Sequence, residues 1–223
     1  GVVVLNVMRD QMDRFAEIDQ TAKLLAKVAG AANEFVVLND DDSRIEAIAE
    51  KLTVNVVKFG VSSSLRKTFL QDDELHGGVA GLQDSQAAVV LQKYNAGVAT
   101  YAINGNICTV ELASLGAHNA QNAAAVLATC VALDTALPDV ITRLSEVKPA
   151  FGRGELFALN KKSVLLQLVK NPGGFRHALL SAESQNTVST MIAINDDYPD
   201  GRDVSWLWDV NFDSLKKGTV ATS

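Results

Sequence analysis

The sequence predicts an α/β fold: most of a central domain with a mostly parallel sheet, helices and an antiparallel hairpin region, followed by the start of a smaller α/β domain. The N-terminal part alternates short apolar runs with segments of helical periodicity, which is typical of a parallel sheet. The next part carries turn signals between apolar runs, as antiparallel hairpins do. A second set of short strands and a helix begins after Pro149.

The N-terminal part predicts strand, helix, strand, helix and strand in that order. Residues 17–29 place apolar side chains at helical spacing. Ser43 followed by Glu46 has the spacing of a capping box at the start of a second helix. The apolar runs between these segments are typical of strands buried on both faces. The predicted strands are residues 2–5, 35–38 and 54–61.

The middle of the chain predicts antiparallel strands and then two helices. Residues 62–86 are polar and irregular, and we expect them to form a surface excursion. Asn104-Gly105 is a strong signal for a two-residue hairpin turn. Pro138 and Pro149 delimit the helices. The predicted elements are strands 87–93, 98–103 and 107–112, and helices 119–136 and 139–147.

A domain boundary is expected near residues 149–154. It divides the chain into a central domain, residues 1–150, and the start of a C-terminal domain, residues 151–223. The second part predicts a strand pair, a helix, a further apolar strand and a loop rich in turn-forming residues. These elements are strands 155–159 and 163–169, helix 174–183, strand 188–194 and loop 195–202.

Composition and charge restrict the class of protein. The chain has 223 residues, a net charge of -6 and a pI of about 5.1. This argues against a general nucleic-acid binder, which needs a basic surface, but is compatible with a phosphate-bearing substrate. Hydrophobic residues make up 48% and charged residues 21%, as in ordinary globular proteins. Two cysteines, Cys108 and Cys130, cannot form a four-cysteine zinc site.

The apolar runs and the start of the chain bear on localisation. No apolar run approaches the ~20 residues that span a bilayer, and the opening residues lack the basic segment of a signal peptide. We therefore expect a reduced, cytoplasmic protein. The chain begins without methionine, directly in an expected core strand, so we expect it to be a piece of a longer protein.

A dense charge cluster follows the first predicted strand. The cluster comes just past the carboxyl end of that strand and consists of Arg9, Asp10, Gln11, Asp13 and Arg14. Open α/β sheets bind ligands at this edge. The alternative is a solvated, self-paired charge run that opens a helix, and the residues alone slightly favour that alternative.

Two asparagines lie at the start of the alanine-rich helix. Asn119 and Asn122 are three residues apart and therefore share a helix face. Their amides could bind a base or ribose, or one of them could simply cap the helix, and the sequence does not separate these readings. His118 alone is typical of a loop histidine.

Two further segments combine a cation with glycines. Arg153 lies between Gly152 and Gly154, where it could pair with a phosphate or could belong to an ordinary turn between domains. Lys170 and Asn171 precede a glycine-rich turn and a helix, which is a weak signal for an anion site. The sequence contains no Gly-x-x-x-x-Gly-Lys-Ser/Thr phosphate loop.

The densest motif spans residues 195–209. A calcium loop is one interpretation, but the glutamate at the twelfth position is missing. A surface turn is another, although so many carboxylates repel one another, which favours a functional role. Trp206 and Trp208 would face the same side of an extended segment. The aspartates of the motif are Asp196, Asp197, Asp200, Asp203 and Asp209.

Taken in order along the chain, these motifs resemble those of the Mur ligase family, and in particular its isoglutaminyl synthase branch, the MurT type. Glutamine in place of histidine in the first motif is the mark of that branch. The resemblance covers nearly the whole chain, and residues 62–86 are its poorest part. The matching segments are Asp10-Gln11-Met12-Asp13-Arg14, Leu38-Asn39-Asp40-Asp41, His118-Asn119-Ala120-Gln121-Asn122, Gly152-Arg153 with Glu155, Lys170-Asn171-Pro172-Gly173-Gly174, and Asn195-Asp196 through Asp200-Gly201-Arg202-Asp203-Val204-Ser205-Trp206.

The resemblance implies an ATP-dependent ligase subunit that amidates the α-carboxylate of D-glutamate in the stem peptide of lipid II. The ammonia would come from a GatD-type class I glutamine amidotransferase in a heterodimer. Asp203 matches the aspartate thought to complete that partner's catalytic triad, where a carboxylate orients the histidine. The residues implied at the nucleotide are Asn119, Asn122, Arg153, Lys170 and Asn171.

The same resemblance sets expectations about cofactors and completeness. Mg²⁺ is implied by the family. Zinc is not expected, because residues 62–86 replace the four-cysteine zinc ribbon of many relatives and this chain has only two cysteines. The family's phosphate loop would precede Asn6, and its C-terminal domain usually continues past Ser223. We therefore expect this chain alone to be inactive, and the substrate would place the whole protein at the inner membrane face.

Two alternatives remain open. One is a Mur-type ligase that adds an amino acid without a glutaminase, against which the Asp-Gly-Arg-Asp-x-Ser-Trp signature argues. The other is a non-catalytic Mur-like scaffold that only recruits an amidotransferase. A requirement for ammonia or for an amino acid separates the synthase from the first, and a phosphate loop in the upstream coding sequence separates it from the second.

Overall fold

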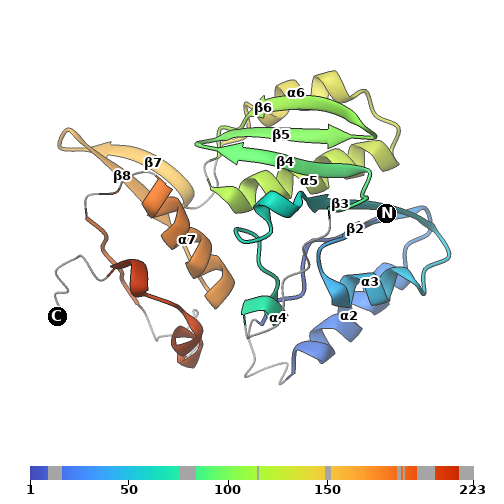
Figure 1. Ribbon diagram of the computed structural model, residues 1–223, viewed down its shortest axis with the longest axis horizontal. Coiled ribbons are helices and arrows are strands. Elements are labelled where there is room, and N and C mark those ends of the chain that lie inside the picture. The colour runs from blue at the N-terminus through green and yellow to red at the C-terminus, as the bar shows by residue number, and fades with distance from the viewer. Residues whose placement is uncertain are drawn as a thin grey trace.

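The computed structural model describes residues 1–9, 17–75, 84–114, 116–148, 152–184, 187, 189–194 and 204–215. Two groups of elements are visible in Figure 1, one around a six-stranded sheet and one around a two-stranded sheet. The boundary near residue 150 stays a prediction, because residues 149–151 lie outside the described ranges.

The described elements follow the order that the sequence predicts in the first part of the chain. The strands are β1 (Val2–Val4), β2 (Phe35–Asn39), β3 (Asn55–Val61), β4 (Val89–Asn95), β5 (Val98–Ile103), β6 (Asn106–Glu111), β7 (Arg153–Leu159) and β8 (Lys162–Gln167). The α-helices are α2 (Ile18–Gly30), α3 (Ser43–Ala49), α4 (Asp72–Leu75), α5 (Ala117–Ala132), α6 (Leu137–Leu144) and α7 (Pro172–Ser184), and the 3₁₀ turns are η1 (Ser63–Leu65), η2 (Ser205–Asp209) and η3 (Asp213–Leu215).

The larger sheet confirms the predicted mixture of parallel and antiparallel pairing. Its order is β1-β2-β3-β4-β5-β6, with β1 to β4 parallel and β4 to β6 antiparallel. The parallel pairs need the α2, α3 and 62–86 connections, whereas the antiparallel pairs are joined by tight turns. Asn104 (φ 47°) and Gly105 (φ 82°) form the predicted turn. Ala96 and Gly97 adopt the same pair of positive φ angles between β4 and β5.

Helices cover both faces of this sheet (Figure 1). All five residues of β2 are buried, as expected for a strand between two layers. Its side chains alternate between the layers: Phe35 and Val37 pack in the core that includes α5, and Val36 and Leu38 pack with residues of α2 and α3. Because α5 is rich in alanine, it packs closely over the sheet.

The segment after β3 differs from the predicted surface excursion. Phe69 is 1% exposed, Arg66 5% and Asp72 2%, so this polar stretch is inserted into the protein rather than lying on it. Asp72 accepts a hydrogen bond from the backbone N–H of Arg9 (3.0 Å), and Arg66 pairs with two carboxylates, as described below. Residues 76–83 of the same stretch lie outside the described residues.

The C-terminal part is built around α7. β7 and β8 form a hairpin whose turn, Asn160 and Lys161, has two positive φ angles. Phe175 and Leu179 of α7 form a small core with Val210. The strand predicted over residues 188–194 is wrong for the described residues 189–194, which form no regular structure. An apolar run becomes a strand only beside a partner strand, and within the described residues neither β7 nor β8 pairs with this run.

Several helix ends also differ from the sequence prediction. Asp42, not Ser43, caps α3, because its side chain accepts hydrogen bonds from the backbone N–H groups of Arg44 and Ile45. α5 begins at Ala117 rather than at residue 119, and Pro138 lies in the first turn of α6 instead of ending the preceding helix. α7 likewise begins earlier than predicted, at Pro172.

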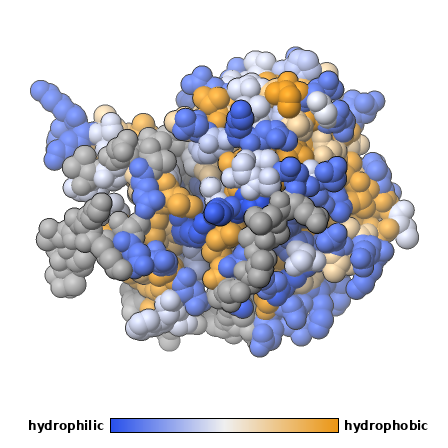
Figure 2. Space-filling model, in the orientation of Figure 1, coloured by the Kyte–Doolittle hydropathy of each residue, from blue (hydrophilic) through white to orange (hydrophobic). Residues whose placement is uncertain are grey.

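Figure 2 shows that the face in view mixes charged and apolar residues, with an apolar patch over α7. No helix of the described chain combines the length and the apolar character needed to cross a membrane.

Candidate functional site

The segments that follow β1 and β2 are tied together at the carboxyl edge of the sheet. Asn39 Nδ2 donates to the carbonyl oxygen of Leu5 (2.9 Å), and Asn39 Oδ1 accepts from the backbone N–H of Asp41 (3.0 Å). Asp42 Oδ2 accepts from the backbone N–H of Val7 (2.8 Å). The Leu38-Asn39-Asp40-Asp41 motif therefore shapes this edge, and its polar groups are largely used within the protein.

The two aspartates of this motif, Asp40 and Asp41, are each paired with a cation. Lys58 Nζ lies 2.7 Å from Asp40 Oδ1, and Arg66 Nη1 lies 3.1 Å from Asp41 Oδ1. Arg66 also pairs with Glu74 through Nη2 and Oε1 (2.8 Å). All three side chains of the Asp41–Arg66–Glu74 cluster are less than 9% exposed. Burial raises the pKa of Asp41 to about 6, although Arg66 works in the opposite direction.

The predicted nucleotide asparagines lie inside α5 rather than at its cap. The N-cap is Gly116, with φ 110° and no side-chain cap, so the capping alternative for an asparagine is wrong. The backbone N–H of Gly116 donates to the hydroxyl of Tyr94 (2.9 Å), which fixes the start of the helix. Asn119 is partly buried and Asn122 is exposed.

The Lys170-Asn171 segment forms the start of α7. Asn171 Oδ1 accepts from the backbone N–H of Gly174 (2.8 Å), so this oxygen caps the helix. Lys170 is exposed. A side-chain carbon placed on Gly173 would lie 2.5 Å from Met8 Cε, so the start of α7 lies against the segment that follows β1. Two sequence motifs far apart in the chain thus meet here.

Of Arg153 the structure describes only the backbone, and it does not describe Asp203 or the Asp10 to Arg14 cluster. Arg153 opens β7 between Gly152 (φ 71°) and Gly154 (φ 81°), next to a register shift in the β7–β8 pair. The placement of its side chain is outside the described part. Asp203 and the Asp10 to Arg14 cluster lie outside the described residues, so their roles stay predictions.

α7 carries two residues that sequence reasoning missed. Arg176 donates from Nη1 to the carbonyl oxygen of Thr68 (2.8 Å) and from Nη2 to that of Lys67 (2.7 Å). The His177 ring lies 6.0 Å from the ring of Phe69 and 5.9 Å from that of His118. Burial, with help from the charges of His118 and Arg176, lowers the pKa of His177 to about 4, so this imidazole is neutral at neutral pH.

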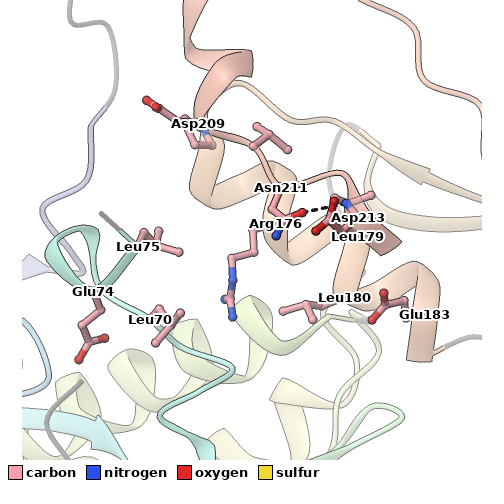
Figure 3. Close-up of a pocket in the computed structure, with 12 residues that line it drawn as sticks. Leu70, Glu74, Leu75, Arg176, Leu179, Leu180, Glu183, Asp209, Asn211 and Asp213 are labelled. Atoms are coloured by element: carbon pink, nitrogen blue, oxygen red, sulfur yellow. Dashed lines mark hydrogen bonds between the residues drawn. The ribbon is translucent and has the colours of Figure 1, made fainter. Parts of the chain in front are cut away.

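Arg176 extends from α7 toward a hollow, as Figure 3 shows. The hollow has a volume of about 370 Å³. α4, α7 and the segment through η2 and η3 line it. The residues that line it include the acidic Glu74, Glu183, Asp209 and Asp213. No local motif indicates Arg176 or His177, because their partners, from Lys67 to His118, lie far earlier in the chain.

The two tryptophans of the 195–209 motif, Trp206 and Trp208, point in different directions. They lie in η2, a 3₁₀ turn, so residues two apart point in different directions rather than to the same side as in a strand. Trp206 is partly buried with its ring 6.2 Å from that of Phe175, whereas Trp208 is 90% exposed.

Comparisons with known proteins agree with this architecture. Residues 1–130 match the Mur ligase middle domain, and residues 168–223 match the MurT ligase C-terminal family. The subunit MurT of lipid II isoglutaminyl synthase (glutamine-hydrolyzing) from Staphylococcus aureus strain COL is 26% identical over 249 aligned positions, which cover 98% of this chain and 55% of that protein. The chain thus spans about half the length of the curated relatives it matches.

Solved structures share the fold at low identity. MurF from Acinetobacter baumannii has a TM-score of 0.65 at 19% identity, covering 83% of this chain and 38% of that one. MurF ligase from Thermotoga maritima in complex with ADP has a TM-score of 0.61 at 18% identity, covering 82% of this chain and 39% of that one. With the middle-domain match spanning more than half of its residues and the MurT match following in the expected order, the chain belongs to the Mur ligase family.

Proposed function

We propose that the full-length protein is the ligase subunit of a lipid II isoglutaminyl synthase and acts with a GatD-type class I glutamine amidotransferase. The observation that supports this most is the succession of two matches in one chain: the Mur ligase middle domain and then the MurT C-terminal family, whose range includes Asp203. The curated relatives that align along almost the whole chain carry the name of that synthase subunit.

In the proposed reaction, ATP phosphorylates the α-carboxylate of D-glutamate in the stem peptide and ADP leaves. Ammonia, released from glutamine by the partner, attacks the acyl carbon and displaces phosphate, which gives D-isoglutamine. Because the carboxylate is activated before the amine arrives, water must be kept from the acyl phosphate. The proposed reaction would take place in the cytoplasm, at the inner membrane face where lipid II lies.

The described residues fit an adenine nucleotide by their donor chemistry. Asn119 and Asn122 share one face of α5, where amides can bind a base or ribose. Lys170 is an exposed cation suited to phosphate, and Arg153 and Asn171 belong to the proposed set by family resemblance. The ADP complex of the Thermotoga maritima relative supports the nucleotide class.

Magnesium fits less well with the residues that are described. Asp40 and Asp41 are paired with Lys58 and Arg66, and Asp42 caps α3 and holds Val7. Within the described ranges, no group of three or more potential metal-ligating side chains comes together. The carboxylates at this edge therefore already make ion pairs or hydrogen bonds within the protein, and they do not provide a magnesium site by themselves.

Asp203 is the proposed contribution of this chain to glutamine hydrolysis. In a catalytic triad, the carboxylate orients the histidine and stabilises its cation. The residue after Asp203, Val204, is the N-cap of η2, and Trp206 anchors η2 to α7. The segment that follows Asp203 is thus attached to a packed helix.

The test is glutamine hydrolysis by the full-length protein co-purified with its amidotransferase, comparing wild type with Asp203→Asn. Loss of a triad aspartate by this change lowers turnover by up to about 10⁴-fold, so we expect a loss of orders of magnitude in a complex that stays intact on gel filtration. Asp139→Asn, an exposed aspartate on α6, is the control and should leave hydrolysis unchanged.

Unchanged hydrolysis in an intact Asp203→Asn complex would reject the shared triad. Amidation of lipid II should then be assayed with ammonia and with amino acids as separate nitrogen donors. Use of an amino acid would identify an amino-acid-adding Mur ligase, and no product with either donor would identify a scaffold.

A further inference from the structure

α7 is placed between the two parts of the described chain. On one side, Phe175 and Leu179 pack against the segment that carries η2. On the other side, Arg176 and His177 contact the part built on the larger sheet. The same short helix therefore touches the neighbourhood of the signature motif and the start of α5.

Arg176 holds α7 to two backbone carbonyls, those of Lys67 and Thr68, at 2.7 and 2.8 Å. Hydrogen bonds from a charged guanidinium are stronger than neutral ones, and the planar fork favours one orientation. The acceptors are themselves fixed, because the neighbouring residue Arg66 is buried between Asp41 and Glu74. The guanidinium of Arg176 and the two carbonyl oxygens that accept its hydrogen bonds are thus both held in place.

His177 makes the contact that reaches the nucleotide motif. Its ring lies 5.9 Å from that of His118, the residue directly before Asn119, and 6.0 Å from that of the buried Phe69. The His118 ring also lies close to Gly116, since a side-chain carbon placed there would lie 2.7 Å from His118 Cε1. The His118 side chain in the first turn of α5 therefore lies beside the N-cap of its own helix and against α7.

We propose that His177 is a positioning residue. Through its contact with His118 it fixes the first turn of α5, and with that turn Asn119. Arg176 holds α7 so that His177 stays in contact with His118. The ligand whose binding depends on this contact is an adenine nucleotide, and in this respect the inference rests on the proposed function. The contact itself, and its effect on the first turn of α5, stand on the structure without a ligand.

Two measurements on the full-length protein test this. The first is amide hydrogen exchange of the backbone over residues 116–122 without nucleotide, which reports local opening of that turn. The second is the affinity for ADP by calorimetry. We expect His177→Ala and Arg176→Ala to speed exchange of this turn and to weaken ADP binding at least tenfold. His177→Phe, which keeps a neutral ring, should stay within threefold of wild type.

Arg143→Ala is the matched control, because Arg143 is an exposed arginine of α6 that pairs with Glu146. It should change neither measurement. If His177→Ala does not fold, Arg176→Lys replaces it: lysine keeps the charge but cannot bind both carbonyls as a fork, so exchange of residues 116–122 should still rise.

The outcomes separate this inference from the proposed function. If wild-type protein binds no ADP but His177→Ala speeds exchange of residues 116–122, the nucleotide role fails and the positioning contact stands. If wild type binds ADP and both His177→Ala and Arg176→Ala leave exchange and affinity unchanged, the inference is overturned. Equal loss with His177→Ala and His177→Phe would also overturn it, because an aromatic ring would then not suffice.

Discussion

Replacing His177 with phenylalanine should remove a specific pH-dependent part of the stability. The pKa of His177 is about 4 in the folded protein against an ordinary value of 6.5. At about 1.4 kcal/mol for each unit of pKa, this interval corresponds to on the order of 3 kcal/mol. Because the pKa is depressed, this contribution is fully present above pH 6.5 and is lost as the pH falls through about 4. Phenylalanine cannot be protonated, so the variant lacks the loss.

Asp41 works in the opposite direction over nearly the same range. Its pKa rises from 3.8 to about 6 on folding, so its contribution is present below pH 3.8 and is lost as the pH rises through about 6. The stability of the wild type alone can therefore change little between these values. The difference between wild type and His177→Phe removes the Asp41 contribution, since both proteins contain that residue.

The assay is urea unfolding of both proteins, followed by circular dichroism, at about pH 7, 5 and 4. The free energy of unfolding of wild type relative to the variant should fall by on the order of 3 kcal/mol from the highest to the lowest pH. Leu180→Ala, on the same helix, is the control and should shift stability by the same amount at each pH. Parallel curves for wild type and His177→Phe would refute the burial of a neutral imidazole between Phe69 and His118.

Two further predictions concern packing and capping, both measured by urea unfolding at neutral pH. Trp206→Ala should cost about 3 kcal/mol because it removes a ring packed on Phe175, whereas Trp208→Ala should stay within about 0.5 kcal/mol because that ring is 90% exposed; equal effects would contradict the geometry of η2. Asp42→Ala should cost about 3 kcal/mol, since it removes the cap of α3 and leaves the buried N–H of Val7 without its acceptor. Asp42→Asn should recover part of that loss, and failure to do so would indicate that the charge matters more than the hydrogen bonds.

The larger sheet could be predicted because its signals are local. Apolar runs such as β2 are buried on both faces, and that pattern needs no knowledge of distant residues. Asn104-Gly105 specifies its turn because both residues tolerate positive φ. The Ala96-Gly97 turn has the same geometry but was not predicted, since alanine is a poor signal for positive φ.

The sequence predicts where some candidate residues lie on the helices. Asn119 and Asn122 do lie on one face of α5, and Lys170 and Asn171 do stand at the start of a helix. The sequence could not show that the side-chain oxygen of Asn171 is used as a cap. The functional assignments of these residues and of Asp203 stay predictions.

Residues 62–75 were misjudged because buried ion pairs fix them together with the core residue Phe69. Arg66 lies between Asp41 and Glu74, and a buried arginine is tolerated only when such partners satisfy it, so no periodicity in the segment reveals its burial. Removing either carboxylate would still leave Arg66 paired with the other, whereas removing Arg66 would leave two buried carboxylates without their cation, at a cost of about 3–5 kcal/mol. The consequence reaches the C-terminal part, because the carbonyls next to Arg66 are the acceptors of Arg176. A polar stretch that looks like a surface loop is therefore the support on which α7 is placed against α5.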